Sequence, residues 1–349
     1  MSDESARIAG RKREHIQIVL DDPVAAAVSA GFERYRLVHC ALPDLDLAAV
    51  DASTRLFGKT LRAPILISGM TGGVDRAAEI NRRLALAARE FGVAMGVGSQ
   101  RVAIENPDFA PFFDIRRHAP DILLLANLGA IQLNCGYGPD ECRRAVDMIG
   151  ADALALHLNP VQEALQAGGD VNWSGLLRRI EAVCSVIETP VVVKEVGWGI
   201  SGAVARQLAE AGVSAIDCAG AGGTSWSEVE RHRAPTERLR AVAAAFVDWG
   251  IPTAESLLMV RAAVPHLPVF ASGGLRSGVD AAKAVALGAD LAGFAAPLLR
   301  AAASSETAAH DALAAIVDQL RVSMFAAGAG DLAALRTAEL IADGAPRWP

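Results

Sequence analysis

The sequence has few cysteines, no long apolar run and no apolar signal segment, and each absence excludes a class of protein. Its five cysteines are scattered without a CxxC spacing, which argues against a structural zinc site or a disulfide framework. No run approaches the roughly 20 apolar residues that cross a bilayer, and the start, MSDESARIAGRKREH, lacks the apolar core of a signal peptide. We therefore expect a cytoplasmic protein without a membrane partner.

An excess of basic residues is also missing. The 33 Lys and Arg residues are outnumbered by 40 Asp and Glu residues, giving a net charge of -7, which argues against a nucleic-acid partner. An anionic ligand would have to be held by a local basic cluster. With 52% apolar and 21% charged residues, the chain can build a large core and is not disordered.

Apolar runs recur from residue 64 onward, and they predict eight short strands. Each run ends at glycine or polar residues, as a buried strand does. Alanine- and leucine-rich amphipathic segments, such as residues 76–91, 203–211 and 278–288, separate most of the runs and are long enough for crossover helices. The eight runs are residues 64–70, 93–99, 122–129, 153–159, 191–197, 215–220, 268–274 and 291–297.

This pattern predicts an α/β protein, a (β/α)8 TIM barrel with an N-terminal extension and insertions at the C-terminal face of the strands. We expect one domain, 1–349, with a cover segment at 1–63, the barrel at 64–300, and C-terminal helices and a tail at 301–349. The insertions are residues 159–173 and 221–248, which follow the fourth and sixth strands. Both extend from the face where barrel active sites lie.

The stretch LHLNPVQEALQAGG at 156–169 places four polar side chains within seven residues at the end of the fourth strand: His157, Asn159, Gln162 and Glu163. This clustering indicates a site, although loops are polar for other reasons too. In the fifth strand, Lys194 interrupts an apolar run, where an ammonium needs a partner. A flavin ring and a carboxylate both remain open as that partner.

Two further segments carry positive charge or exposed N–H groups. SGGLRSG at 272–278 follows the seventh strand, where this architecture often binds phosphate, and it contains Arg276. Near the N-terminus, residues 1–10 read as loose, and RKREHIQIVL at 11–20 predicts a helix that stops near Asp21 and Pro23. We expect residues 1–15 to be mobile until an anionic ligand binds.

Taken together and in order, the motifs RKREH, SGMTGG, GSQR, HLNPVQE, VVVKEVG, GAGGTSW, DWGIPT and SGGLRSG resemble those of the type 2 isopentenyl-diphosphate isomerase family. The match covers residues 7–300. The resemblance implies an FMN enzyme of isoprenoid biosynthesis that interconverts isopentenyl diphosphate and dimethylallyl diphosphate, with reduced FMN as acid and base. It also implies Mg²⁺, NADPH as reductant, and a homotetramer or larger assembly.

The resemblance also implies roles for single residues. Gln162 would be catalytic, in positioning or proton relay, and Glu163 would bind the metal. The substrate would be held by Arg11, Lys12, Ser99, Gln100, Arg101, His157, Asn159 and Gln162. The FMN would be held by Gly69, Met70, Thr71, Ser99, Asn127, Lys194, Thr224, Gly273, Gly274, Leu275, Arg276, Ala295 and Ala296.

The main alternative is an FMN-dependent 2-hydroxy-acid oxidoreductase on the same barrel. Such an enzyme needs a base, usually a histidine at the end of the sixth strand, but residues 217–220 read DCAG. A flavin-binding barrel without catalysis is a second alternative. It has no need of a separate diphosphate-binding set, so the motifs favour the isomerase.

Overall fold

The computed structural model describes the backbone of residues 3–70 and 72–343, and the side chains from residue 10 onward within these ranges. At its centre is a closed barrel of parallel strands in the order β10-β11-β4-β5-β6-β7-β8-β9. The strands are β4 (Ile65–Ile67), β5 (Ala94–Gly96), β6 (Leu124–Gly129), β7 (Ala153–His157), β8 (Val191–Lys194), β9 (Ala215–Asp217), β10 (Val269–Ser272) and β11 (Leu291–Phe294). Each lies within a predicted run, so the predicted TIM barrel is confirmed.

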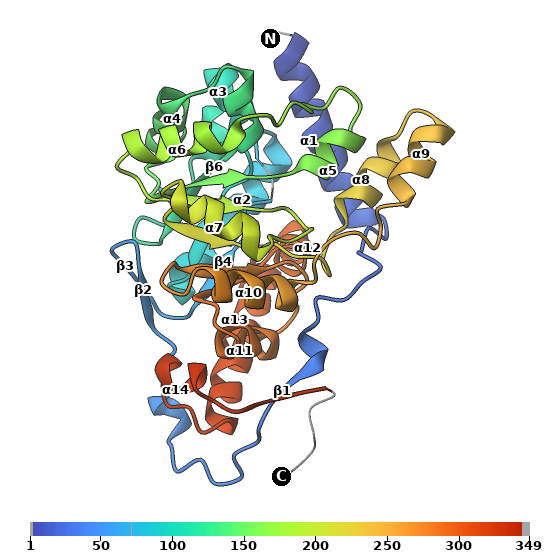
Figure 1. The fold of residues 1–349 in the computed structure, drawn as a ribbon. Coiled ribbons are helices and arrows are strands. Elements are labelled where there is room, and N and C mark those ends of the chain that lie inside the picture. The colour runs from blue at the N-terminus through green and yellow to red at the C-terminus, as the bar shows by residue number, and fades with distance from the viewer. Residues whose placement is uncertain (1–2, 71, 344–349) are drawn as a thin grey trace.

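Helices connect the strands and cover the barrel (Figure 1). Their bounds agree closely with the predicted segments because alanine and leucine at helical spacing bury one face of each helix. The barrel helices are α2 (Asp75–Phe91), α3 (Arg101–Glu105), α4 (Pro139–Ile149), α6 (Leu176–Val186), α7 (Gly202–Glu210), α10 (Thr253–Ala263), α11 (Gly278–Ala286) and α12 (Ala296–Ser304). None of the helices in the described ranges is both long and apolar enough to cross a membrane.

The two insertions form helices above the strand ends. They are α5 (Pro160–Leu165) in the first insertion, and α8 (Trp226–Arg233) and α9 (Glu237–Ala244) in the second. Helix α1 (Asp3–Asp21) contacts α3 and α8, and α8 contacts α5 (Figure 1). The predicted end of α1 is right, but the loose segment predicted at 1–10 is wrong from Asp3 onward, because the helix already begins there.

The cover segment contains a hairpin that the sequence did not reveal. Strands β2 (Thr54–Leu56) and β3 (Lys59–Leu61) pair through a two-residue turn. Leu61 belongs to an apolar cluster with the inward-facing side chains of the strands, and Leu56 and Phe57 pack against that cluster. The hairpin therefore closes the N-terminal end of the barrel.

The C-terminal part also differs from the prediction of helices and a tail. Helices α13 (Glu306–Ala326) and α14 (Leu332–Arg336) are followed by strand β12 (Leu340–Ala342), which pairs with β1 (Tyr35–Leu37). The two strands join the cover segment to the end of the chain. Short 3-10 helices complete the chain at Phe32–Arg34, Leu47–Ala49, Pro107–Phe113 and Ala130–Cys135.

Side chains inside the barrel form an apolar layer and a polar layer. The apolar layer includes Leu66, Leu125, Val192 and Phe270. Because successive residues of a strand face opposite sides, the residues two or four positions further along the same strands also point inward. These positions form what we call the polar ring: Ser68, Asn127, His157, Lys194, Asp217 and Ser272.

Candidate functional site

A cavity of about 520 Å³ opens at the C-terminal end of the barrel, beside the polar ring. Its size falls within the range of small-molecule sites. Helix α1 covers it, and the loops after the strands surround it. The predicted site residues that line it are Arg11, Lys12, Gly69, Met70, Ser99, Arg101, Asn127, His157, Asn159, Gln162, Glu163, Lys194, Thr224, Gly273, Gly274, Leu275, Arg276, Ala295 and Ala296.

Two predicted residues are absent from this lining, for different reasons. Thr71 lies outside the described residues. The side chain of Gln100 is fully buried: its Nε2 donates to Ala145 O at 2.8 Å, and its Oε1 accepts from Asn127 N at 2.9 Å. The Gln100 side chain therefore turns inward and holds the backbone of β6, and its contact with a substrate stays a prediction.

The cationic end of the cavity lies where α1 meets the strand ends. Lys12 Nζ donates to Ser99 O at 2.5 Å. Burial, and then the charge of Arg11, lower the pKa of Lys12 to about 7. Burial and the charges of Lys194 and Lys12 lower the pKa of His157 to about 3, so its imidazole is neutral near pH 7. His157 Nδ1 lies 2.9 Å from Asn127 Oδ1, which fixes the ring.

Helix α5 brings together the polar side chains of the HLNPVQE stretch. Asn159 Nδ2 donates to Gln162 Oε1 at 3.1 Å and to Glu163 Oε1 at 3.0 Å. Glu163 Oε2 accepts from Asp170 N at 2.8 Å and from Gln166 Nε2 at 3.2 Å. Asn159 Oδ1 is buried and lacks a partner among the described residues. This amide therefore offers an acceptor oxygen next to the Glu163 carboxylate.

A second group of site residues escaped the sequence prediction. Glu230, on α8, accepts from Gln162 Nε2 at 3.2 Å and lies 3.1 Å from His15 Nε2. Burial raises the pKa of Glu230, but the hydrogen bond from His15 and the charge of Arg233 bring it below its ordinary value. The spacing could have revealed His15, since it lies one helical turn after Arg11 and Lys12.

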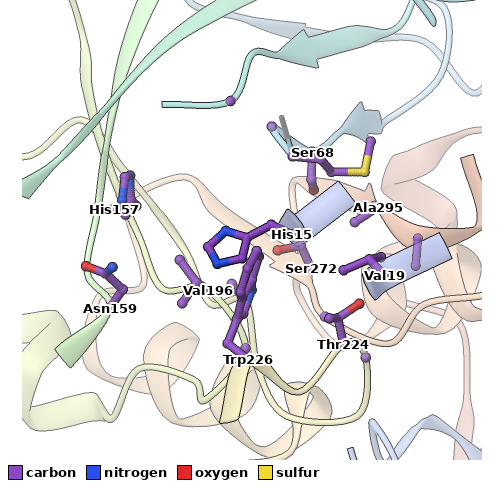
Figure 2. A pocket seen from close by; sticks show the side chains of 18 of the residues that line it. His15, Val19, Ser68, His157, Asn159, Val196, Thr224, Trp226, Ser272 and Ala295 are labelled. Carbon is purple, nitrogen blue, oxygen red and sulfur yellow. The ribbon is translucent and has the colours of Figure 1, made fainter. Parts of the chain in front are cut away.

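His15 and Trp226 form the middle of the cavity wall. Their rings meet edge to face with centroids 5.2 Å apart. Figure 2 shows His157 and Asn159 on one side of this pair, and Ser68, Ser272 and Ala295 on the other. The cavity therefore has two ends, one cationic and polar and the other lined by glycine, alanine and serine.

The loops at the second end need glycine for close packing, whether or not they also bind an anion. A Cβ on Gly274 would lie 2.6 Å from the backbone of Gly222, and one on Gly223 would lie 2.7 Å from Gly274 N. The loops after β9 and β10 can therefore touch only without side chains. Glycine alone does not identify a phosphate site here.

The N–H groups at this end give a sharper indication. Helix α11 is closed by a capping box, because Ser277 and Asp280 hydrogen-bond reciprocally at its start. Helix α12 begins at Ala296 without a side-chain cap, and the first N–H groups of a helix have no partner within it. With Arg276 also at the cavity wall, the start of α12 suits a phosphate.

The residues present suit both an FMN and a divalent cation. For the flavin, the cavity offers Lys194, the start of α12, and Ser68 Oγ, which is buried and lacks a partner among the described side chains. For the cation, Glu163 is the one carboxylate among the described residues that line the cavity, and the described part of the chain contains no cluster of three or more His, Cys, Asp or Glu. Mg²⁺ commonly uses one or two carboxylates and completes its shell with phosphate and water.

Comparison with known proteins matches the chain to a family model, to curated relatives and to solved structures. The FMN-dependent dehydrogenase family model matches residues 162–342. An isopentenyl-diphosphate delta-isomerase of Xanthobacter autotrophicus is 58% identical over 341 residues, covering 97% of this chain and 98% of the relative. One of Stutzerimonas stutzeri is 56% identical over 336 residues, covering 96% and 97%.

Similar solved structures include mandelate oxidases. One of them, a single-substitution variant with 4-Br-2-hydroxy-methylphenylacetate, has a TM-score of 0.66 at 20% identity and covers 97% of this chain and 98% of its own. Another, with a monooxide FMN adduct, has a TM-score of 0.64 at 20% identity and covers 93% and 95%. At this identity the likeness concerns the fold alone.

Proposed function

The chain belongs to the isopentenyl-diphosphate delta-isomerase family, and we propose that it interconverts isopentenyl diphosphate and dimethylallyl diphosphate in its barrel cavity. The observation that carries the proposal is the division of that cavity into two ends. One end suits a flavin phosphate and ring, and the other suits a diphosphate with a cation. An oxidoreductase of small hydroxy acids has no use for the second end.

The flavin end would hold FMN by its phosphate and by its ring. Arg276 and the uncapped start of α12, at Ala296, would hold the phosphate. Lys194 supplies a positive charge at the ring, where electron density rises on reduction. When bound in its reduced form, FMN would supply the acid and base that move a proton between two substrate carbons.

The diphosphate end neutralises charge. Arg11, Lys12 and Arg101 line it, and guanidinium groups can make bidentate phosphate contacts. Glu163 and the free oxygen of Asn159 would hold Mg²⁺ against the same diphosphate. Because Asn159 Nδ2 is committed to Gln162 and Glu163, its contact with the substrate would run through the cation.

Between the two ends, Gln162 would fix the substrate carbons. Its amide is oriented on both sides, by Asn159 at the oxygen and by Glu230 at the nitrogen. The amide is neutral at accessible pH, so positioning or relay suits it better than general base catalysis. His15 and Trp226 would exclude water from the cavity while the substrate carbons carry positive charge.

NADPH as reductant, a cytoplasmic location and a homotetramer or larger assembly belong to the proposal as well. They rest on the family resemblance of the sequence motifs. The role of NADPH as reductant is tested by the rate at which NADPH bleaches the bound flavin under anaerobic conditions.

The experiment that tests the function is an anaerobic incubation with isopentenyl diphosphate, Mg²⁺, FMN and dithionite. We expect dimethylallyl diphosphate to form, and none to form when the reductant is left out. Product formation by the flavin-free or oxidised protein would reject the reduced-flavin reaction. A protein that stays colourless after FMN addition would reject every flavin function.

A further inference from the structure

Asp217 is a buried carboxylate to which the proposed function assigns no role. It lies in the polar ring on β9, and its side chain is 1% exposed. Ser272 Oγ, on the next strand, donates to Asp217 Oδ1 at 2.6 Å, and Ala219 N donates to the same oxygen at 3.3 Å. A carboxylate buried in this way is costly unless a charge compensates it.

The charge that can compensate Asp217 is Lys194. Strands β8 and β9 pair in register with Lys194 opposite Asp217, and partners on neighbouring parallel strands face the same side of the sheet. Both line a space of about 10 Å³ inside the barrel. Lys194 also lines the large cavity, whereas Asp217 does not. The carboxylate therefore lies beneath the lysine, seen from the cavity.

The other neighbours of Lys194 do not replace this carboxylate. On β7, the neighbouring strand on the other side of β8, His157 is paired in register with Lys194, and its low pKa leaves it neutral. Glu195 is the next residue along the strand, and Lys194 Nζ donates to its backbone O at 2.5 Å. Its carboxylate is committed elsewhere, because Oε2 accepts from the N–H groups of residues 196–198. Of the six side chains of the polar ring, Asp217 is the one carboxylate.

We propose that Asp217 is the positioning residue for Lys194: the carboxylate, itself oriented by Ser272, compensates the charge of the lysine and fixes where its ammonium would meet the flavin ring. The pair carries no net charge, which makes a buried ammonium tolerable at the floor of the cavity. Burial raises the pKa of Asp217, and the charge of Lys194 and the hydrogen bond from Ser272 oppose that rise. The inference rests on the proposed function in one respect, that FMN occupies the cavity.

The test is a double-mutant cycle on flavin binding, with Asp217→Asn, Lys194→Met and the double variant. The dissociation constant of FMN and the midpoint potential of the bound flavin are measured for each. If Asp217 acts through Lys194, both single variants weaken FMN binding by about tenfold or more, equivalent to 1.4 kcal/mol, and both lower the potential. The double variant then equals Lys194→Met, because Asn at 217 has no lysine to act on.

Three outcomes would overturn the proposal. Additive losses in the double variant would mean that Asp217 acts independently of Lys194. A raised potential in Asp217→Asn would mean that its charge acts directly on the flavin, and unchanged binding and potential would mean that the carboxyl is protonated. If wild-type protein does not bind FMN at all, the proposed function fails instead.

Ser272→Ala provides a second variant if Asp217→Asn does not fold. It removes the hydroxyl that orients the carboxylate and leaves both charges in place. We expect a change in binding and potential of the same direction but smaller size. No change in Ser272→Ala, with both charges intact and the fold verified by circular dichroism, would count against positioning by this hydrogen bond.

Discussion

At the scale of single residues, Gln162 is the side chain whose length matters most. Its amide spans Asn159 and Glu230, and one methylene fewer breaks at least one of these contacts. We expect Gln162→Asn to lower kcat by about 100-fold or more while the dissociation constant of FMN is unchanged. Steady-state kinetics and a flavin absorbance titration measure the two. Full activity in Gln162→Asn would remove this residue from the reaction.

The lowered pKa of Lys12 predicts how the affinity for the substrate depends on pH. Its pKa of about 7 in the free site means that the ammonium is present below pH 7 and is lost above it. A diphosphate prefers the protonated lysine, so KM should be lowest below pH 7 and rise as the pH increases through that value.

Two substitutions separate this titration from that of the substrate. Lys12→Arg keeps its charge throughout and should keep a low KM without the rise, whereas Lys12→Met should have a high KM at every pH. KM is measured between about pH 6 and pH 9, on either side of the lysine pKa. The same rise in Lys12→Arg would assign the titration to another group.

At the scale of elements, the hairpin of β2 and β3 contributes stability at the end of the barrel opposite the cavity. Leu61 is 1% exposed and packs in the inner apolar cluster. Leu61→Ala should lower the free energy of unfolding by about 2–5 kcal/mol, measured by urea denaturation, without changing FMN affinity. Leu42→Ala is the matched control, because Leu42 is 85% exposed and should change stability by less than about 0.5 kcal/mol. Equal losses in both variants would contradict the closure of the barrel by this hairpin.

The elements also show what the sequence could and could not predict. The eight strands were predictable because each is a short apolar run closed by glycine or polar residues, and the motifs led correctly to the isomerase family. The pairing of β1 with β12 was not, since it joins Tyr35 to Ala342 and leaves no local pattern. The inward orientation of Gln100 could not be predicted for a related reason: a motif fixes which residues occur together, but not which way each side chain turns.

At the scale of the whole molecule, two arginines make equivalent hydrogen-bond clusters with the loops of the barrel. Arg116 and Arg261 each donate to several loop carbonyls and to an aspartate, Asp152 or Asp290. Each aspartate also accepts from the first N–H group of β6 or β10. In barrel order these two strands lie four positions apart. Each half of the eight-stranded barrel therefore contains one such cluster.

Equivalent clusters should contribute equally to stability. We expect Arg116→Ala and Arg261→Ala each to lower the free energy of unfolding by about 2 kcal/mol or more, because several partly buried carbonyls and an aspartate lose their donor together. Arg143→Ala, which breaks an exposed ion pair with Asp140, should cost less than about 1 kcal/mol. Chemical denaturation compares the three. A large loss for Arg143 or none for Arg116 would contradict this.

The central claim is that one cavity holds a reduced flavin and a diphosphate for a reaction without net redox change. The most direct measurement is the ratio of dimethylallyl diphosphate formed to reductant consumed, under anaerobic conditions with a limiting amount of dithionite. We predict many product molecules for each reductant molecule, with the flavin still reduced at the end. One reductant consumed for each product, or no product, would contradict the claim.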